Sequence, residues 1–176
     1  MTHMKKLACG ALATALTIGG GLALSLSPAS AQTEAGQKVI NYPVNKTQNN
    51  VAIGGYDLVA YFKNKEAVKG SERHAVKYGD TVYRFASKAH QDAFLANPRK
   101  YLPRFGGFCP VNMGEGKTQK GNPEHFAVRN GQLYLCASAA AQEKFEGDPE
   151  AFIAKAEENA PRALREFDKR GKAAQQ

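Results

Sequence analysis

The sequence has few of the residues and patterns from which enzyme active sites are built. Cysteine occurs three times in 176 residues, and no two cysteines form a C-x-x-C redox pair. A Ser/His/Asp signature, a phosphate-binding glycine-rich loop and a paired-carboxylate motif are also missing. Two short glycine motifs, Gly106-Gly-Phe-Cys and Gly114-Glu-Gly, are better explained as tight backbone turns. We therefore expect that the protein is not an enzyme.

The charge of the chain does not indicate a nucleic-acid-binding protein. The formal net charge is +8, and the basic residues are spread along the chain and become denser in residues 162–172. That segment has the composition of a solvated helix and tail. A nucleic-acid-binding face would instead interleave basic residues with aromatic ones. We expect loose attraction to anionic surfaces and no nucleic-acid partner.

One apolar segment, at the N-terminus, is long enough to enter a membrane. After two lysines, Leu7–Leu26 is an uncharged run of about 20 residues, and Ser27-Pro-Ala-Ser-Ala31 ends in a small-x-small cleavage pattern. A membrane anchor is disfavoured because the run is rich in Ala and Gly and the cleavage pattern follows directly. Lys6 also disfavours lipidation of Cys9. We expect a signal peptide at residues 1–31, a periplasmic or secreted protein, and no stable membrane insertion after cleavage.

The rest of the chain contains an internal duplication. The stretch from Gly54 to Val76 matches the stretch from Gly106 to Val128 without a gap, at an offset of 52 residues. One deletion later, Val82–Tyr101 matches 133–152 at an offset of 51. The shared Gly-Gly-aromatic, Ala-Ser, Gln, Phe and Pro at one spacing are improbable by chance.

Each repeat has the pattern strand, turn, strand, helix, helix. Glycine turns separate two short strands, as in a β-hairpin, and a serine at the following junction is placed to cap a helix. An Asn-Pro or Asp-Pro pair then ends that helix and begins another. The residues that carry these signals are Val76, Tyr83, Ser87, Phe94 and Asn97 in the first repeat, and Val128, Tyr134, Ser138, Phe145 and Asp148 in the second.

These patterns predict an α+β fold in which two strand-turn-strand-helix-helix repeats pack as one small domain, with pseudo-twofold symmetry. A unit of about 50 residues rarely buries a sufficient core alone, so the repeats need each other. The expected division of the chain is a signal peptide at 1–31, an N-terminal arm at 32–50, a duplicated domain at 51–161 with repeats at about 54–102 and 106–157, and a basic C-terminal helix or tail at 162–176.

Four motifs resemble the YHS domain family, in particular its exported bacterial members. They lie at Gly54–Phe62, Tyr83–Ser87, Asn97–Tyr101 and Phe105–Cys109, and the resemblance covers about residues 53–161. The wider YHS and TRASH group is linked to the binding of soft metals, especially copper, in metal-transport and sensing proteins. The resemblance therefore implies a metal ion as ligand and a metal-transport or envelope protein as partner.

In that wider group, a cysteine in an early loop joins one or two cysteines on the hairpin just before the helix. Cys109 and Cys136 hold those two positions in the second repeat, but Ala140 replaces the next cysteine. The first repeat has Asp57 and Phe85 at the matching positions, so it has no thiolate site. We thus expect the second repeat to carry the thiolate site and the first repeat to have only a structural role.

Two interpretations of the cysteine pair stay open. In an oxidising compartment, a disulfide between Cys109 and Cys136 would contribute about 3 to 4 kcal/mol by loop entropy. Alternatively, the two thiolates together with Met113 and His125 form a sulfur and nitrogen ligand set for Cu(I), or next for Zn(II). Our leading hypothesis is an exported soluble protein that binds or handles a soft metal ion, copper before zinc.

Two other classes of function were weighed against metal binding. A nucleophilic Cys109 would need a nearby base, for which His125 and His90 are the candidates, but no motif places either one beside it. The runner-up is a disulfide-stabilised module that binds a non-metal ligand or a protein in a cleft between the repeats. The aromatic residues considered for such a cleft are Tyr56, Tyr61, Tyr83, Phe108 and Tyr134.

Overall fold

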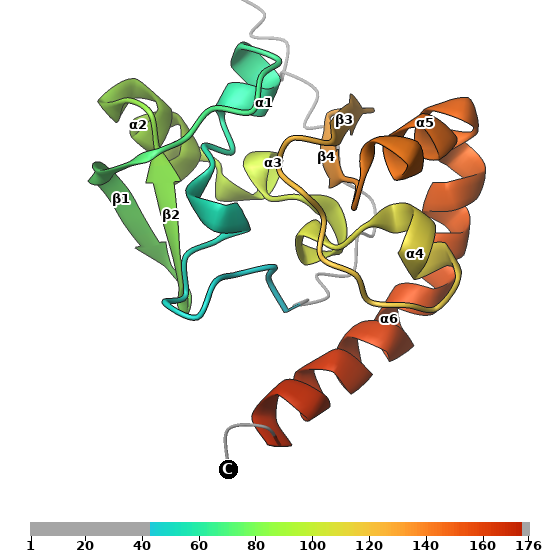
Figure 1. Ribbon diagram of the computed structural model, residues 1–176. Helices are drawn as coiled ribbons and strands as arrows, with labels where there is room; N and C mark the ends of the chain where they lie inside the picture. The colour runs from blue at the N-terminus through green and yellow to red at the C-terminus, as the bar shows by residue number, and fades with distance from the viewer. Residues whose placement is uncertain (1–42, 174–176) are drawn as a thin grey trace, which may run out of the picture. The chain divides into compact units, whose positions relative to one another are not determined.

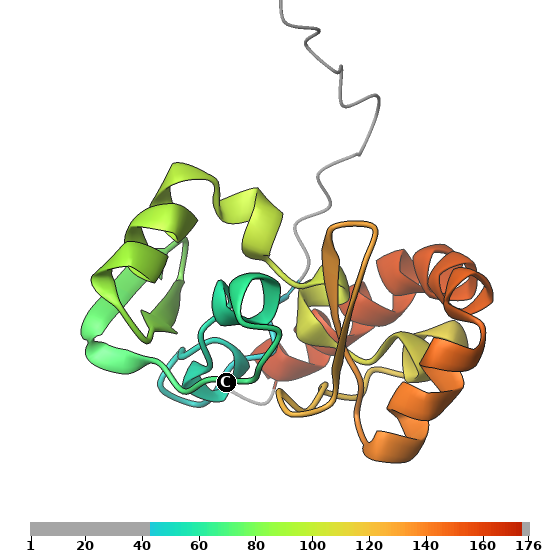
Figure 2. The same ribbon diagram turned by 90° about the horizontal axis from the view of Figure 1, so that it is seen from above.

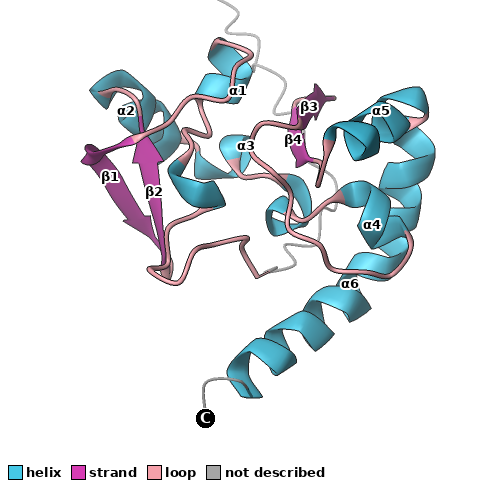
Figure 3. Ribbon diagram, viewed as in Figure 1, coloured by secondary structure: helices cyan, strands magenta, loops and turns pink. Residues whose placement is uncertain are grey.

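The computed structural model describes residues 43–173 (Figure 1). The expected signal peptide, most of the arm and the last three residues lie outside the described part. The α+β class is confirmed: the structure contains helices and two separate two-stranded antiparallel sheets (Figure 3). The elements are η1 (Ile53–Gly55), α1 (Ala60–Lys63), β1 (Ser71–Tyr78), β2 (Thr81–Phe85), α2 (Lys88–Ala96), α3 (Pro98–Tyr101), η2 (Arg104–Gly107), α4 (Pro110–Gly114), β3 (Phe126–Arg129), β4 (Gln132–Leu135), α5 (Ala139–Gly147) and α6 (Pro149–Ala173).

Both repeats have the expected order of elements and the same helix starts. The strands β1 and β2 form one antiparallel hairpin, and β3 and β4 form the other. Ser87 Oγ accepts a hydrogen bond from the His90 N–H at 3.2 Å, and Ser138 Oγ accepts one from Ala141 N–H at 3.2 Å. These serines cap α2 and α5 because each satisfies an amide that has no partner within its own helix.

The one-residue deletion lies earlier than the sequence alignment placed it. In the first hairpin Val76 pairs with Tyr83, and in the second Ala127 pairs with Tyr134. Val76 is therefore equivalent to Ala127 and not to Val128, and both hairpins have two-residue turns. The gap falls in the loop before the first strand of each repeat, where sequence similarity is too low to locate it.

The turn before each candidate site position has the same unusual backbone in both repeats. Gly54 and Gly106 have φ angles of 60° and 64°, and Gly55 and Gly107 have 81° and 84°. Such left-handed conformations strongly favour glycine. At Gly107 space is limiting as well, because an added Cβ would lie 2.5 Å from the Ile53 side chain. Each glycine pair thus reverses the chain just before Asp57 or Cys109.

The second hairpin lies between the two hydrophobic cores. Leu133 and Leu135 on one face of β4 pack into the core of the first repeat, whereas Tyr134 and Cys136 point into the core of the second. Figure 2 shows this hairpin between the first repeat and helices α5 and α6. The first hairpin is not used in this way, because Arg84, the equivalent of Leu135, is only half-buried and pairs with a surface glutamate. The expected pseudo-twofold packing therefore does not extend to the hairpins.

Both ends of the domain are integrated into the fold more closely than the sequence indicated. At the end of the arm, buried Asn45 donates hydrogen bonds from Nδ2 to the carbonyls of Gly107 and Gly121 at 3.2 Å and 3.0 Å. At the other end, α6 continues through Pro161, so residues 162–173 form its last part and not a separate tail. The helix packs on α4. Among residues 43–173, no helix is long and apolar enough to cross a membrane.

Candidate functional site

Cys109 and Cys136 lie together in the core of the second repeat. Cys109 immediately precedes α4, and Cys136 immediately follows β4. Both side chains are fully buried in the same hydrophobic cluster, and both thiols are free. The two cysteines predicted as a pair therefore lie in one core, and they are free thiols and not a disulfide.

Backbone amides surround the Cys109 sulfur. It accepts hydrogen bonds from the backbone of Val111, Asn112 and Ala137. The first two belong to the start of α4, and the third follows β4, so two separate segments contribute. We call these three amides the backbone cradle. A group of converging N–H dipoles of this kind favours negative charge.

The two thiols have opposite acidities. The hydrogen bond from Cys136 lowers the pKa of Cys109 to about 6, and the cradle amides act in the same direction, although burial opposes them. The pKa of Cys136 is raised, first because its thiol is engaged with Cys109 and then because it is buried. The surroundings of Cys109 thus favour its thiolate, whereas those of Cys136 favour its neutral thiol.

Of the two additional residues predicted as metal ligands, one lies in the same core and the other does not join the pair. Met113 is fully buried in the hydrophobic cluster that contains both cysteines. The His125 carbonyl accepts a hydrogen bond from Cys136 N–H at 2.7 Å, so its backbone is adjacent. Its side chain does not complete a site, because residues 43–173 contain no group of three His, Cys, Asp or Glu side chains that could hold a metal ion.

The first repeat has the same cradle with a carboxylate in it, which the sequence reasoning missed. Asp57, fully buried, accepts hydrogen bonds at Oδ1 from the N–H groups of Val59 and Ala60 at 2.8 Å and 3.3 Å, and at Oδ2 from Ala86 N–H at 2.8 Å. His90 Nδ1 also lies 2.7 Å from Oδ2. His90 was considered as a base for Cys109, but it serves Asp57. The alignment of Asp57 with Cys109 was the available signal.

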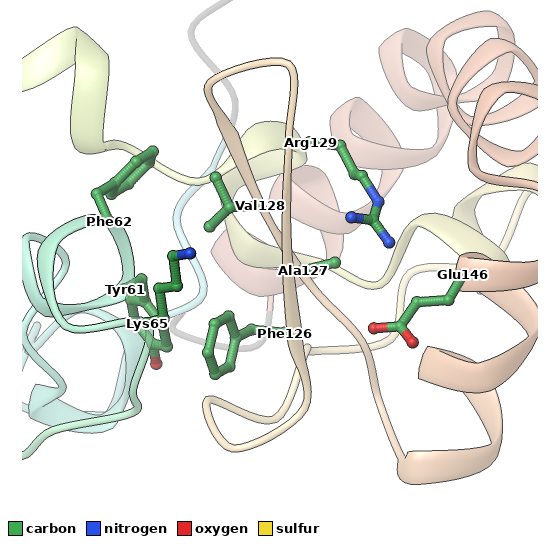
Figure 4. A pocket seen from close by; sticks show the side chains of 8 residues that line it. All are labelled: Tyr61, Phe62, Lys65, Phe126, Ala127, Val128, Arg129 and Glu146. Carbon is green, nitrogen blue, oxygen red and sulfur yellow. The ribbon is translucent and has the colours of Figure 1, made fainter.

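A cavity between the repeats is lined by neither cysteine. It has a volume of about 360 Å³ (Figure 4). Its lining includes Tyr61, Phe62 and Lys65 from α1 and the turn after it, Phe126 and Arg129 from β3, and Glu146 from α5. Of the aromatic residues expected to line such a cleft, Tyr61 does so. Tyr83, Phe108 and Tyr134 are buried in the two cores instead.

Comparison with known proteins does not identify the chain. No family model, no curated protein and no solved structure matches it.

Proposed function

We propose that this protein is an exported, soluble YHS-like protein that binds Cu(I) through Cys109 and Cys136, in exchange with a metal-transport or envelope protein. The observation that supports the proposal is the burial of Cys109, Cys136 and Met113 in one hydrophobic cluster, because it gathers three soft sulfur ligands in one core. The cradle contributes as well, since a metal-binding cysteine must be deprotonated and backbone amides favour the thiolate of Cys109.

The ligand set fits Cu(I) better than Zn(II). Thiolate and thioether sulfur select Cu(I), which is stable with two or three soft ligands, whereas structural zinc sites have four ligands. Two thiols and the thioether of Met113 in one buried cluster match the two or three soft ligands that Cu(I) requires. The four ligands of a structural zinc site are not present within the described residues, where no third His, Cys, Asp or Glu side chain joins the pair.

A module that binds a non-metal ligand is the second candidate, and the cavity between the repeats favours it. The cavity combines aromatic rings with two cations, Lys65 and Arg129, and one carboxylate, Glu146. In that account the cysteines serve stability alone, as a disulfide formed after export. Loss of Cu(I) binding on removal of the cysteines separates the two candidates.

Metal analysis of untagged protein purified from the periplasm tests the proposal in its natural setting. Purification under reducing, oxygen-free conditions should yield about one copper ion per chain, because two thiolates and a thioether form one soft site. The Cys109→Ser/Cys136→Ser double variant should contain none, and His125→Ala serves as the matched control that keeps the copper. Zinc in place of copper, or copper that persists in the double variant, would contradict the proposal.

A further inference from the structure

The duplication provides an internal comparison for Cys109. In the first repeat, the cradle holds a group with two acceptor oxygens, one toward Val59 and Ala60 and the other toward Ala86. In the second repeat, the three equivalent amides converge on a single sulfur atom. Such a cradle matches a sulfur that carries oxygen atoms, because a sulfinate has the charge and the two oxygens of a carboxylate.

We propose that Cys109 is an oxidation site for hydrogen peroxide, with Cys136 as the thiol that resolves the oxidised sulfur and the backbone cradle as the group that holds it. The inference is independent of metal binding, since it rests on the equivalence of Cys109 with Asp57 and on the burial of both cysteines in one hydrophobic cluster. Nothing in the chemistry requires a metal ion or any further residue.

The reaction proceeds in two balanced steps. The Cys109 sulfur attacks one oxygen of hydrogen peroxide, the O–O bond breaks, and the leaving hydroxide takes the thiol proton to form water. Cys109 is thereby oxidised to a sulfenic acid and the peroxide is reduced. The Cys136 sulfur then attacks the Cys109 sulfur, the S–O bond breaks, and a disulfide and a second water form. If Cys136 is absent, a second peroxide instead oxidises the sulfenic acid to a sulfinic acid.

Burial limits which oxidants can react. Both cysteines are fully buried, so the oxidant must be small and neutral, and hydrogen peroxide meets both conditions. The second repeat also has only the methyl group of Ala141 at the position from which His90 contacts Asp57 in the first. No side chain equivalent to that imidazole competes for the cradle.

Peptide mapping by mass spectrometry tests the proposal on reduced, metal-free protein in which Cys9 is replaced by Ser. Hydrogen peroxide should link the Cys109 and Cys136 peptides with the loss of two hydrogens, and dithiothreitol should reverse the link. In Cys136→Ala, Cys109 should gain two oxygens. In Cys109→Ser, Cys136 should stay unmodified under the same exposure. Oxidation of Cys136 in that variant, or no reaction of either thiol in the parent protein, overturns the proposal.

A pair of carboxylate substitutions tests the cradle without any oxidant. Cys109→Asp mimics the sulfinate and should melt close to the parent protein, because the cradle offers it the amides that Asp57 uses. Cys136→Asp places a carboxylate at an equally buried position outside the cradle, and we expect a melting temperature lower by about 15 °C or no folded protein. If both substitutions lower the melting temperature equally, the cradle does not accept an oxidised Cys109. Because no metal ion is present, a failure here leaves the Cu(I) proposal unaffected.

Discussion

Asp57 and Cys109 occupy the same position in the two repeats, and each is held by three equivalent backbone amides. In the first repeat the cradle holds a carboxylate that contacts His90, and in the second it holds a thiol that contacts Cys136. One backbone arrangement thus serves structure in one half and sulfur chemistry in the other. The duplication provides matched positions for tests of the hairpins and of the capping serines.

Asp57→Ala should lower the free energy of unfolding by about 3 kcal/mol or more, because it leaves three backbone N–H groups without their acceptor. His90→Ala should cost less, since the carboxylate keeps its amide partners. Urea denaturation at neutral pH measures both. Equal losses in the two variants would show that the contact with His90, and not the cradle, stabilises this site.

Leu135→Ala and Arg84→Ala change equivalent positions of the two hairpins with different results. Leu135 is fully buried in the core of the first repeat, so its truncation should cost about 2 to 5 kcal/mol. Arg84 is half-buried and pairs with Glu72 at the surface, so its truncation should cost about 1 kcal/mol or less. Chemical denaturation checks the difference. Similar losses at the two positions would contradict the asymmetric use of the hairpins.

Ser87→Ala and Ser138→Ala should each lose about 1 kcal/mol, because each removes the acceptor for one first-turn amide. The two helices lie in different repeats, and the double variant should lose the sum of the two effects. Thermal or urea melts test this. A variant that loses nothing would mean that its helix start is stabilised by another group.

Stability should depend on pH through Cys109. Its pKa is lowered from 9.0 to about 6 on folding, so the thiolate stabilises the folded state at high pH, and this contribution is lost as the pH falls through about 6. The raised pKa of Cys136 changes the folding stability only above pH 9.0, the ordinary pKa of its thiol. The difference in unfolding free energy between the reduced protein and Cys109→Ser should therefore increase from about pH 6 to about pH 9. A difference that is flat or falls over this range would contradict a thiolate in the cradle.

The sequence predicted the repeated local structure well because its signals are local. The capping residues Ser87 and Ser138 and the prolines at Pro98 and Pro149 each determine a helix boundary from their own chemistry. The deletion was misplaced because hairpin register depends on pairing between strands. The different environments of Leu135 and Arg84 depend on how the repeats pack, which no local pattern encodes.

Prediction of the site had the same limits. The sequence singled out Cys109 and Cys136 as a pair, and both lie in the buried core of the second repeat. The side chain of His125 was expected to join them because it begins the next strand, yet only its backbone is adjacent. Asp57 was regarded merely as a lost cysteine, since amide donors carry no sequence signature. The alignment of two short polar side chains at one position was the clue to a shared backbone site.

Competition titration of the reduced protein against a Cu(I) chelator tests the central claim most directly. The reduced protein should take up about one Cu(I) per chain, with affinity that falls as protons compete for sulfur at lower pH. Cys109→Ser and Cys136→Ser should each abolish binding, Met113→Leu should weaken it, and His125→Ala should leave it unchanged. If the reduced protein competes no better than the Cys109→Ser/Cys136→Ser double variant, the pair does not bind Cu(I) and the account is wrong.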